Sequence, residues 1–319
     1  MNYGLPYKGS KNRIAKRLVE ALPAAPVLYD VFAGGCAVTH AAMLSGKYQR
    51  FVVNDLRGWL PDAFREAING GYAHEDRWIS REDFERLKST DAYAAMCFSF
   101  GNDCRAYMYA RGLEPYKRAL HYAIFWRDFA PWAALCPETA DALASGLAPI
   151  EDRKQRRIQA GHFIVESLKA QLAAEMLTPD ILDKPIYRQI RKPKDTSNSL
   201  QSLQNLERLQ SLERLRSLEC LPGALTAHSG DYRELCFDEP GIIYCDPPYK
   251  STKERYGREF DAEAFYGWCE AQKLPVYISE YQMPEERFAC IAEWDKITAM
   301  AAKMTTHVTE RLWRPRTQL

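Results

Sequence analysis

The chain has 319 residues, 46% hydrophobic and 27% charged, which is ordinary for a soluble globular protein with one large or two modest domains. No apolar stretch approaches the roughly 20 residues that span a bilayer, and the first residues lack the pattern of a signal peptide, so we expect a cytoplasmic protein with no membrane partner. A net charge of +1 excludes attraction of nucleic acid by total charge, so any DNA contact must come from local basic patches. Nine cysteines form no C-x-x-C pair, which favours reduced thiols and no metal site.

The first sixty residues predict a strand–helix–strand unit. A short apolar run over residues 27–32 is typical of a buried parallel strand. Two glycines then turn the chain into an alanine-rich helix over about residues 36–45, and a second strand over residues 51–53 stops at Asp55. Such a βαβ unit is how a doubly wound sheet begins.

The same rhythm returns late in the chain, after a mainly helical stretch over about residues 58–195. Strands at 241–245 and 276–278 flank a helix at 261–272, and a strand-forming end near 306–313 closes the sheet. We therefore predict an α/β fold with a doubly wound, Rossmann-like sheet that is interrupted by a mainly helical insertion.

This pattern predicts two domains, one formed by residues 1–57 and 225–319 and the other by residues 58–224. In the second domain, leucines recur at every third position from residue 200 to residue 221. A spacing of three does not match the roughly 3.6 residues per turn of an α-helix. The repeat could be a helix buried on several sides or packed on a partner, a repetitive coil, or a disordered tract.

The sharpest chemical signal is the tetrapeptide Asp246-Pro247-Pro248-Tyr249, which directly follows the strand at 241–245. Ligands of doubly wound sheets bind outside the carboxyl ends of the strands. An adenine amine is a poor nucleophile because its lone pair is delocalised into the ring. Asp246 and the Pro247 carbonyl can accept its two hydrogens, while consecutive prolines stiffen the turn. Tyr249 offers a flat face on which an extruded base can stack, and methyl transfer from a sulfonium needs in-line positioning but no metal.

A second signal is the segment from Asp30 to Ala37, at the first strand-to-helix turn. Glycines there let the backbone approach a ligand, and the N-terminus of the following helix favours a carboxylate. Asp55 ends the next strand, where an acidic residue hydrogen-bonds ribose hydroxyls in nucleoside-binding sheets. The alternative for Asp55 is a helix N-cap.

Together these motifs resemble the Dam-type adenine-N6 DNA methyltransferases of the alpha group, in which cofactor motifs precede a target-recognition insertion and the catalytic tetrapeptide. The motifs are, in chain order, Tyr7 to Lys11, Asp30 to Ala37, Asp55, Phe98 to Asn102, Gly230 to Tyr232, Asp246 to Tyr249, and Ser279-Glu280-Tyr281. The last of them, with the leucine repeat, is most similar to orphan enzymes of phages and mobile elements.

The resemblance implies S-adenosylmethionine as the cofactor and duplex DNA as the partner, with the target adenine flipped out of the helix. Residues 1–57 and 225–319 would form the cofactor-binding catalytic domain, and residues 58–224 the target-recognition insertion. The residues implied to bind the cofactor are Tyr7, Lys11, Asp30, Phe32, Ala33, Gly34, Gly35, Asp55, Asp231 and Tyr232. Those implied to hold the adenine are Asp246, Pro247, Pro248 and Tyr249.

Basic segments indicate where DNA would bind. Residues 187–194 interleave a tyrosine with cations, which suits phosphate contacts. Residues 153–157 fit either phosphate contacts or the solvated start of a long helix. The residues expected to contact DNA are Lys8, Asn102, Arg105, Arg188, Arg191, Lys192 and Lys194.

Two other functions stay open. The same tetrapeptide serves RNA targets, so an RNA adenine-N6 methyltransferase is one alternative. A catalytically silent DNA-binding module is the other, although all four positions of the tetrapeptide are present. We expect an enzyme that works on DNA in the cytoplasm of a bacterial host cell.

Overall fold

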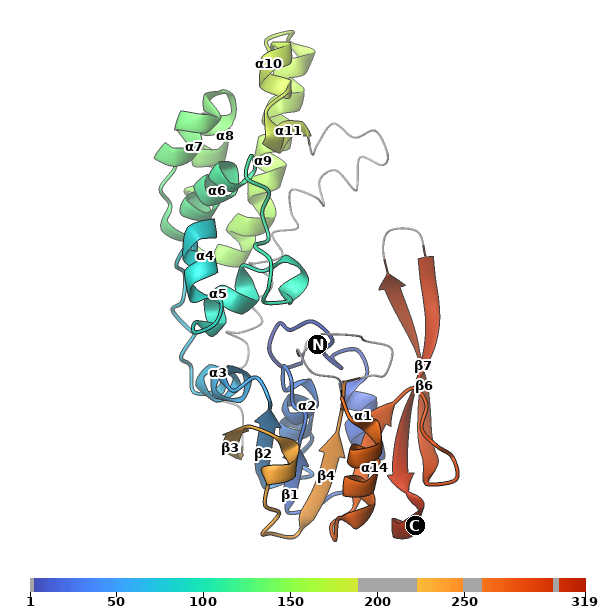
Figure 1. The fold of residues 1–319 in the computed structure, drawn as a ribbon. Helices are drawn as coiled ribbons and strands as arrows, with labels where there is room; N and C mark the ends of the chain where they lie inside the picture. Colours follow the sequence, from blue (N-terminus) through green and yellow to red (C-terminus); the bar gives the residue numbers. More distant parts are fainter. Residues whose placement is uncertain (1–2, 189–222, 249–259, 301–303) are drawn as a thin grey trace. The chain divides into compact units, whose positions relative to one another are not determined.

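The computed structural model describes residues 3–188, 223–248, 260–300 and 304–319 (Figure 1). The leucine repeat at 200–221 lies outside the described residues.

The chain divides into two compact units, one comprising Met1–Ala73 and Arg214–Leu319 and the other comprising His74–Glu213. The first unit extends past the expected boundary at residue 57, because helix α3 (Trp59–Ile68) packs against strands β2 (Arg50–Asp55) and β3 (Ala224–Ser229).

The first unit is built on one seven-stranded sheet. Besides β2 and β3, its strands are β1 (Val27–Asp30), β4 (Gly241–Cys245), β5 (Val276–Glu280), β6 (Phe288–Met300) and β7 (Met304–Pro315). The strand order is β3-β2-β1-β4-β5-β7-β6, in which the first five strands are parallel and β7 runs antiparallel to both β5 and β6. The predicted doubly wound, Rossmann-like α/β fold is confirmed.

Helices cover both faces of this sheet. They include α1 (Ala15–Ala21), α2 (Ala37–Ser45), α3 and α14 (Ala262–Ala271). All four residues of β1 are buried, as expected for a parallel strand inside a two-sided core. Tyr29 packs with Phe265 of α14, whereas the next residue, Asp30, bonds Thr39 of α2. Successive residues of β1 thus point to opposite faces of the sheet.

The second unit is helical where the structure describes it, as the sequence predicts. Its helices are α4 (Arg81–Leu87), α5 (Ala92–Cys97), α6 (Glu114–Trp126), α7 (Ala130–Leu135), α8 (Pro137–Leu147), α9 (Arg153–Ala173), α10 (Pro179–Leu182) and α11 (Pro185–Arg188). The basic stretch 153–157 begins α9. There Arg156 is buried and donates to the carbonyl oxygens of Ile124 and Ile150, at 2.5 and 2.9 Å. Arg156 therefore serves helix packing.

Candidate active site

Four carboxyl groups lie at the carboxyl-end edge of the parallel strands. Asp30 and Asp55 end β1 and β2, Asp246 follows β4, and Glu280 ends β5. The fold therefore brings the tetrapeptide to the same edge as the glycine turn, although the two are far apart in the sequence. This is the edge where doubly wound sheets bind their ligands.

The N-terminal loop packs directly on the glycine turn after β1. The Leu5 amide donates to the Gly35 carbonyl oxygen at 2.6 Å. A Cβ atom at position 35 would lie 2.9 Å from the Cβ atom of Tyr7, so the close approach requires glycine. Gly34 takes a left-handed φ of 49°, and a Cβ atom there would lie 3.7 Å from the Tyr7 ring. Three predicted cofactor residues are thus neighbours.

The Asp55 carboxylate fixes this turn from β2. Its Oδ2 atom accepts from the Gly34 amide at 2.9 Å, and its Oδ1 atom accepts from the Arg57 amide at 2.8 Å. Burial raises the pKa of Asp55, and these backbone hydrogen bonds oppose that shift. The N-cap of α3 is Gly58, so Asp55 does not cap that helix. Ala33, the predicted cofactor residue beside Gly34, donates its amide to the Asn54 carbonyl oxygen at 2.8 Å.

Asp30 is a buried carboxyl group with one oxygen in use. Its Oδ2 atom accepts from the Thr39 hydroxyl at 2.6 Å, whereas Oδ1 is buried and has no hydrogen-bond partner among the described residues. Burial, together with the nearby Asp246 and Asp55 carboxylates, raises the pKa of Asp30 to about 7, although the hydrogen bond from Thr39 lowers it. Asp30 therefore carries a polar atom that a ligand could satisfy.

Lys11 lies between two carboxylates. Its ammonium is 2.8 Å from Asp246 Oδ1 and 3.0 Å from Glu310 Oε1, and both Lys11 and Glu310 are buried. Burial alone would lower the pKa of Lys11, but Asp246 and Glu310 together raise it, so Lys11 stays charged. The sequence predicts Lys11 at the cofactor, and in the structure its ammonium binds the first residue of the tetrapeptide.

Aromatic rings surround Phe32, which follows β1. The ring centroids of Phe32 and Tyr232 are 5.1 Å apart, and those of Phe32 and Phe265 are 5.6 Å apart. Next to Tyr232, Asp231 caps a short 3₁₀ helix (Tyr232–Glu234) and pairs with Arg233 at 2.5 Å. Two further predicted cofactor residues, Phe32 and Tyr232, therefore contact each other.

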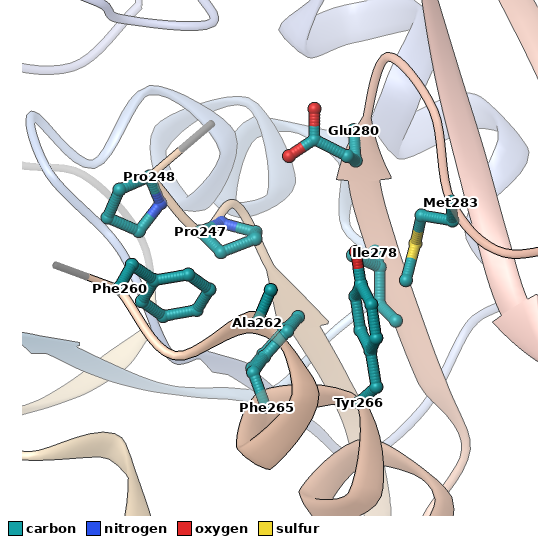
Figure 2. A pocket seen from close by; sticks show the side chains of 9 residues that line it. All are labelled: Pro247, Pro248, Phe260, Ala262, Phe265, Tyr266, Ile278, Glu280 and Met283. Carbon is teal, nitrogen blue, oxygen red and sulfur yellow. The ribbon is translucent and has the colours of Figure 1, made fainter. Parts of the chain in front are cut away.

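A pocket opens beside the tetrapeptide, between β4, β5 and α14 (Figure 2). It is lined by Pro247, Pro248, Phe260, Ala262, Phe265, Tyr266, Ile278, Glu280 and Met283. Among the described residues of this lining, Glu280 is the only acidic one; the others are apolar apart from one tyrosine. The pocket thus places one acidic side chain next to the two prolines of the tetrapeptide.

Residues 7–122 match a family model described as D12 class N6 adenine-specific DNA methyltransferase. The match supports an adenine-specific DNA methyltransferase. The mixed seven-stranded sheet with flanking helices is consistent with a Rossmann-like methyltransferase fold. Methyltransferases of this kind imply S-adenosylmethionine as methyl donor and DNA as substrate. No curated protein matches the chain.

The residues predicted to contact DNA are spread over both units of the chain. Lys8 is exposed on the N-terminal loop, and Arg105 is exposed in the helical unit. Asn102 is half-buried and donates from Nδ2 to the Met96 carbonyl oxygen at 2.8 Å. The exposed Arg188 lies 3.7 Å from Asp183.

Four predicted site residues lie outside the described part of the chain, namely Tyr249, Arg191, Lys192 and Lys194. Within the described part, no group of three or more His, Cys, Asp or Glu residues could hold a metal ion. No helix described in the structure is long and apolar enough to cross a membrane.

Sequence reasoning assigned no role to two carboxyl groups at this site. Glu280 belongs to the Ser279-Glu280-Tyr281 motif, which contributed to the family resemblance but for which the sequence predicted no role. Glu310 lies in β7 and had no signal, because its contact with Lys11 arises only from the pairing of β7 with β5.

Proposed function

We propose that this chain transfers a methyl group from S-adenosylmethionine to the N6 amine of adenine in DNA, as a Dam-type enzyme similar to the orphan enzymes of phages and mobile elements. The observation that supports it best is the setting of Asp246. This carboxylate follows a buried strand, shares a sheet edge with Asp30 and Asp55, and is ion-paired to the buried Lys11.

The glycine turn fits the cofactor. Asp30 has a buried oxygen without a partner among the described residues, and Gly34 and Gly35 let Tyr7 pack closely on the turn that follows it. The cofactor supplies an electrophilic methyl group on a sulfonium. In the proposed arrangement the residues from Asp30 to Gly35 hold its methionine part, Asp55 accepts from the ribose hydroxyls, and Tyr7 closes the turn.

The adenine end of the cofactor would lie beside Asp231 and Tyr232. The Tyr232 ring belongs to an aromatic cluster with Phe32 and Trp268, with centroids 5.1 Å away in each case. Such a cluster offers apolar surface for a purine.

The tetrapeptide would hold the acceptor base. Asp246 and the Pro247 carbonyl oxygen accept from the two amine hydrogens, which localises the nitrogen lone pair as it attacks. Pro248 stiffens the turn, and Tyr249 stacks on the base. Because N6 is hard to reach inside a duplex, the base must flip out. Basic residues of the helical unit would contact the phosphate backbone of the DNA. The enzyme would act on DNA in the cytoplasm of a bacterial host cell.

The test is incubation of the purified protein with labelled S-adenosylmethionine and mixed-sequence duplex DNA, followed by nucleoside analysis and mapping of the modified positions. N6-methyladenine is the expected product. Asp246→Ala should lower the rate at least about 100-fold, whereas Asp62→Ala, at an exposed position of α3, should leave it unchanged. Full activity of Asp246→Ala would contradict the assigned role.

The same experiment separates the alternatives. A preference for structured RNA over duplex DNA would identify an RNA methyltransferase. Absence of cofactor binding in calorimetry, with DNA binding retained, would identify a silent binding module.

A further inference from the structure

Glu280 stands level with Pro247 across two neighbouring strands. The parallel strands β4 and β5 pair Cys245 with Ile278, so two residues further on Pro247 and Glu280 face the same level of the edge. The backbone at Glu280 is fixed, because its carbonyl oxygen accepts from the indole nitrogen of Trp313 at 3.0 Å.

The Glu280 carboxyl group borders the same pocket as the two prolines. Figure 2 shows this side chain extending from the end of β5 toward the side of the pocket that carries Pro247 and Pro248. Its Oε1 atom accepts from the Tyr281 amide at 2.8 Å. No hydrogen bond of Oε2 is seen with the residues that the structure describes, so this atom can serve a ligand.

The charges around Glu280 favour its neutral form. Burial, together with the Asp246 and Glu310 carboxylates, raises the pKa of Glu280 to about 7, although the hydrogen bond from the Tyr281 amide lowers it. Lys11 opposes the shift, but its ammonium is bonded to those same two carboxylates. Arg311, the cross-strand neighbour of Glu280, donates to the Tyr281 carbonyl oxygen and pairs with Glu293. A carboxylic acid at this place is a hydrogen-bond donor.

Adenine has a complementary edge. Its amine carries two donors. The ring nitrogens N1 and N7 are acceptors; N1 is bonded to the carbon that carries the amine, and N7 is bonded to the next ring carbon on the other side. In the proposed function Asp246 and Pro247 use the donors, which leaves one flanking ring nitrogen toward the next strand. We infer that the protonated Glu280 carboxyl group donates a hydrogen bond to the ring nitrogen beside the target amine. Glu280 is then a residue that recognises the base; this inference rests on the proposed function.

The test uses the mapped duplex substrate with adenine, 1-deazaadenine or 7-deazaadenine at the target position. Glu280→Ala should lower kcat/KM for adenine roughly 10- to 100-fold, because an acceptor of the base loses its partner. Glu280→Gln, whose amide still donates, should retain most of the activity. With wild-type protein, kcat/KM for one of the two deaza bases should be lower than that for adenine by the same factor. Glu280→Ala should have equal kcat/KM for that deaza base and for adenine.

The pH dependence gives a second readout. The donating form of Glu280 is lost as pH rises through about 7, whereas Gln donates at every pH. The ratio of kcat/KM for wild type to that for Glu280→Gln should therefore fall as pH rises through this range. A constant ratio would overturn the inference.

The controls separate this inference from the proposed function. Glu286→Ala, at an exposed position on the following loop, should behave as wild type, and cofactor affinity of Glu280→Ala should be unchanged in calorimetry. Two results would overturn the role of Glu280 while leaving the proposed function intact. One is wild-type activity of Glu280→Ala on adenine. The other is that wild type and Glu280→Ala discriminate equally against both deaza bases. Failure of every variant, wild type included, to methylate adenine would overturn the proposed function.

Discussion

The Lys11 ammonium lies 2.8 Å from a carboxylate oxygen of Asp246. This ion pair joins the N-terminal loop, which packs on the glycine turn, to the tetrapeptide after β4. The side chain of Asp246 is only 19% exposed and that of Lys11 only 3%, so solvent screens the pair weakly. The buried Lys11 ammonium thereby links the position of the glycine turn, where the cofactor is expected, to the position of the Asp246 carboxylate.

Removal of that cation should destabilise the protein. Lys11→Met leaves Asp246 and the fully buried Glu310 without their shared partner. Breaking a buried ion pair from one side costs about 3–5 kcal/mol. Urea unfolding measures this loss, and Lys16→Met, at a position whose side chain is 75% exposed, serves as the control with an expected change below about 0.5 kcal/mol. Equal stability of Lys11→Met and wild type would show that the ion pair does not stabilise the fold.

Glu310 should act as a positioning residue for the reaction. In Glu310→Gln the side-chain volume is kept, but Lys11 loses one of its two carboxylates and binds Asp246 more strongly. Asp246 then accepts less well from the target amine, so kcat should fall several-fold while KM for DNA stays unchanged. Single-turnover and steady-state kinetics measure this split. A rise in KM with unchanged kcat would instead indicate a role in DNA binding.

The sequence predicted the parts of the fold that carry a strong local pattern. The bounds of β4, Gly241–Cys245, match the prediction because an apolar run ends at a proline-rich turn. Strand β3 was missed because it is an edge strand with mostly exposed or half-buried residues, so it has little hydrophobic signal. The partner of Lys11 could not be predicted, because it depends on how the N-terminal loop meets β7.

Asp30 should make stability depend on pH. Its pKa rises from the usual 3.8 to about 7 in the folded protein, so the folded state binds a proton that the unfolded state has released. The contribution of Asp30 is fully present below pH 3.8 and is lost as pH rises toward about 7. Asp30→Asn removes this dependence and can still accept from Thr39. Its stability relative to wild type should rise by roughly 2–4 kcal/mol between pH 4 and pH 8. Urea unfolding at several pH values measures the difference, and a difference that is constant with pH would contradict the buried acid.

The carboxylate of Asp55 should control cofactor affinity through the glycine turn. It accepts from the amides of Gly34 and Arg57, so Asp55→Ala removes both acceptors and frees a left-handed turn. We expect the Kd for S-adenosylmethionine to rise about 10-fold or more, since a lost hydrogen bond to a charged group is worth roughly 1.5–3 kcal/mol. Asp55→Asn, which keeps one carbonyl acceptor, should lose less. Isothermal titration calorimetry measures both affinities. If the two variants bind the cofactor as tightly as wild type, the turn is held without Asp55 and the ribose is bound elsewhere.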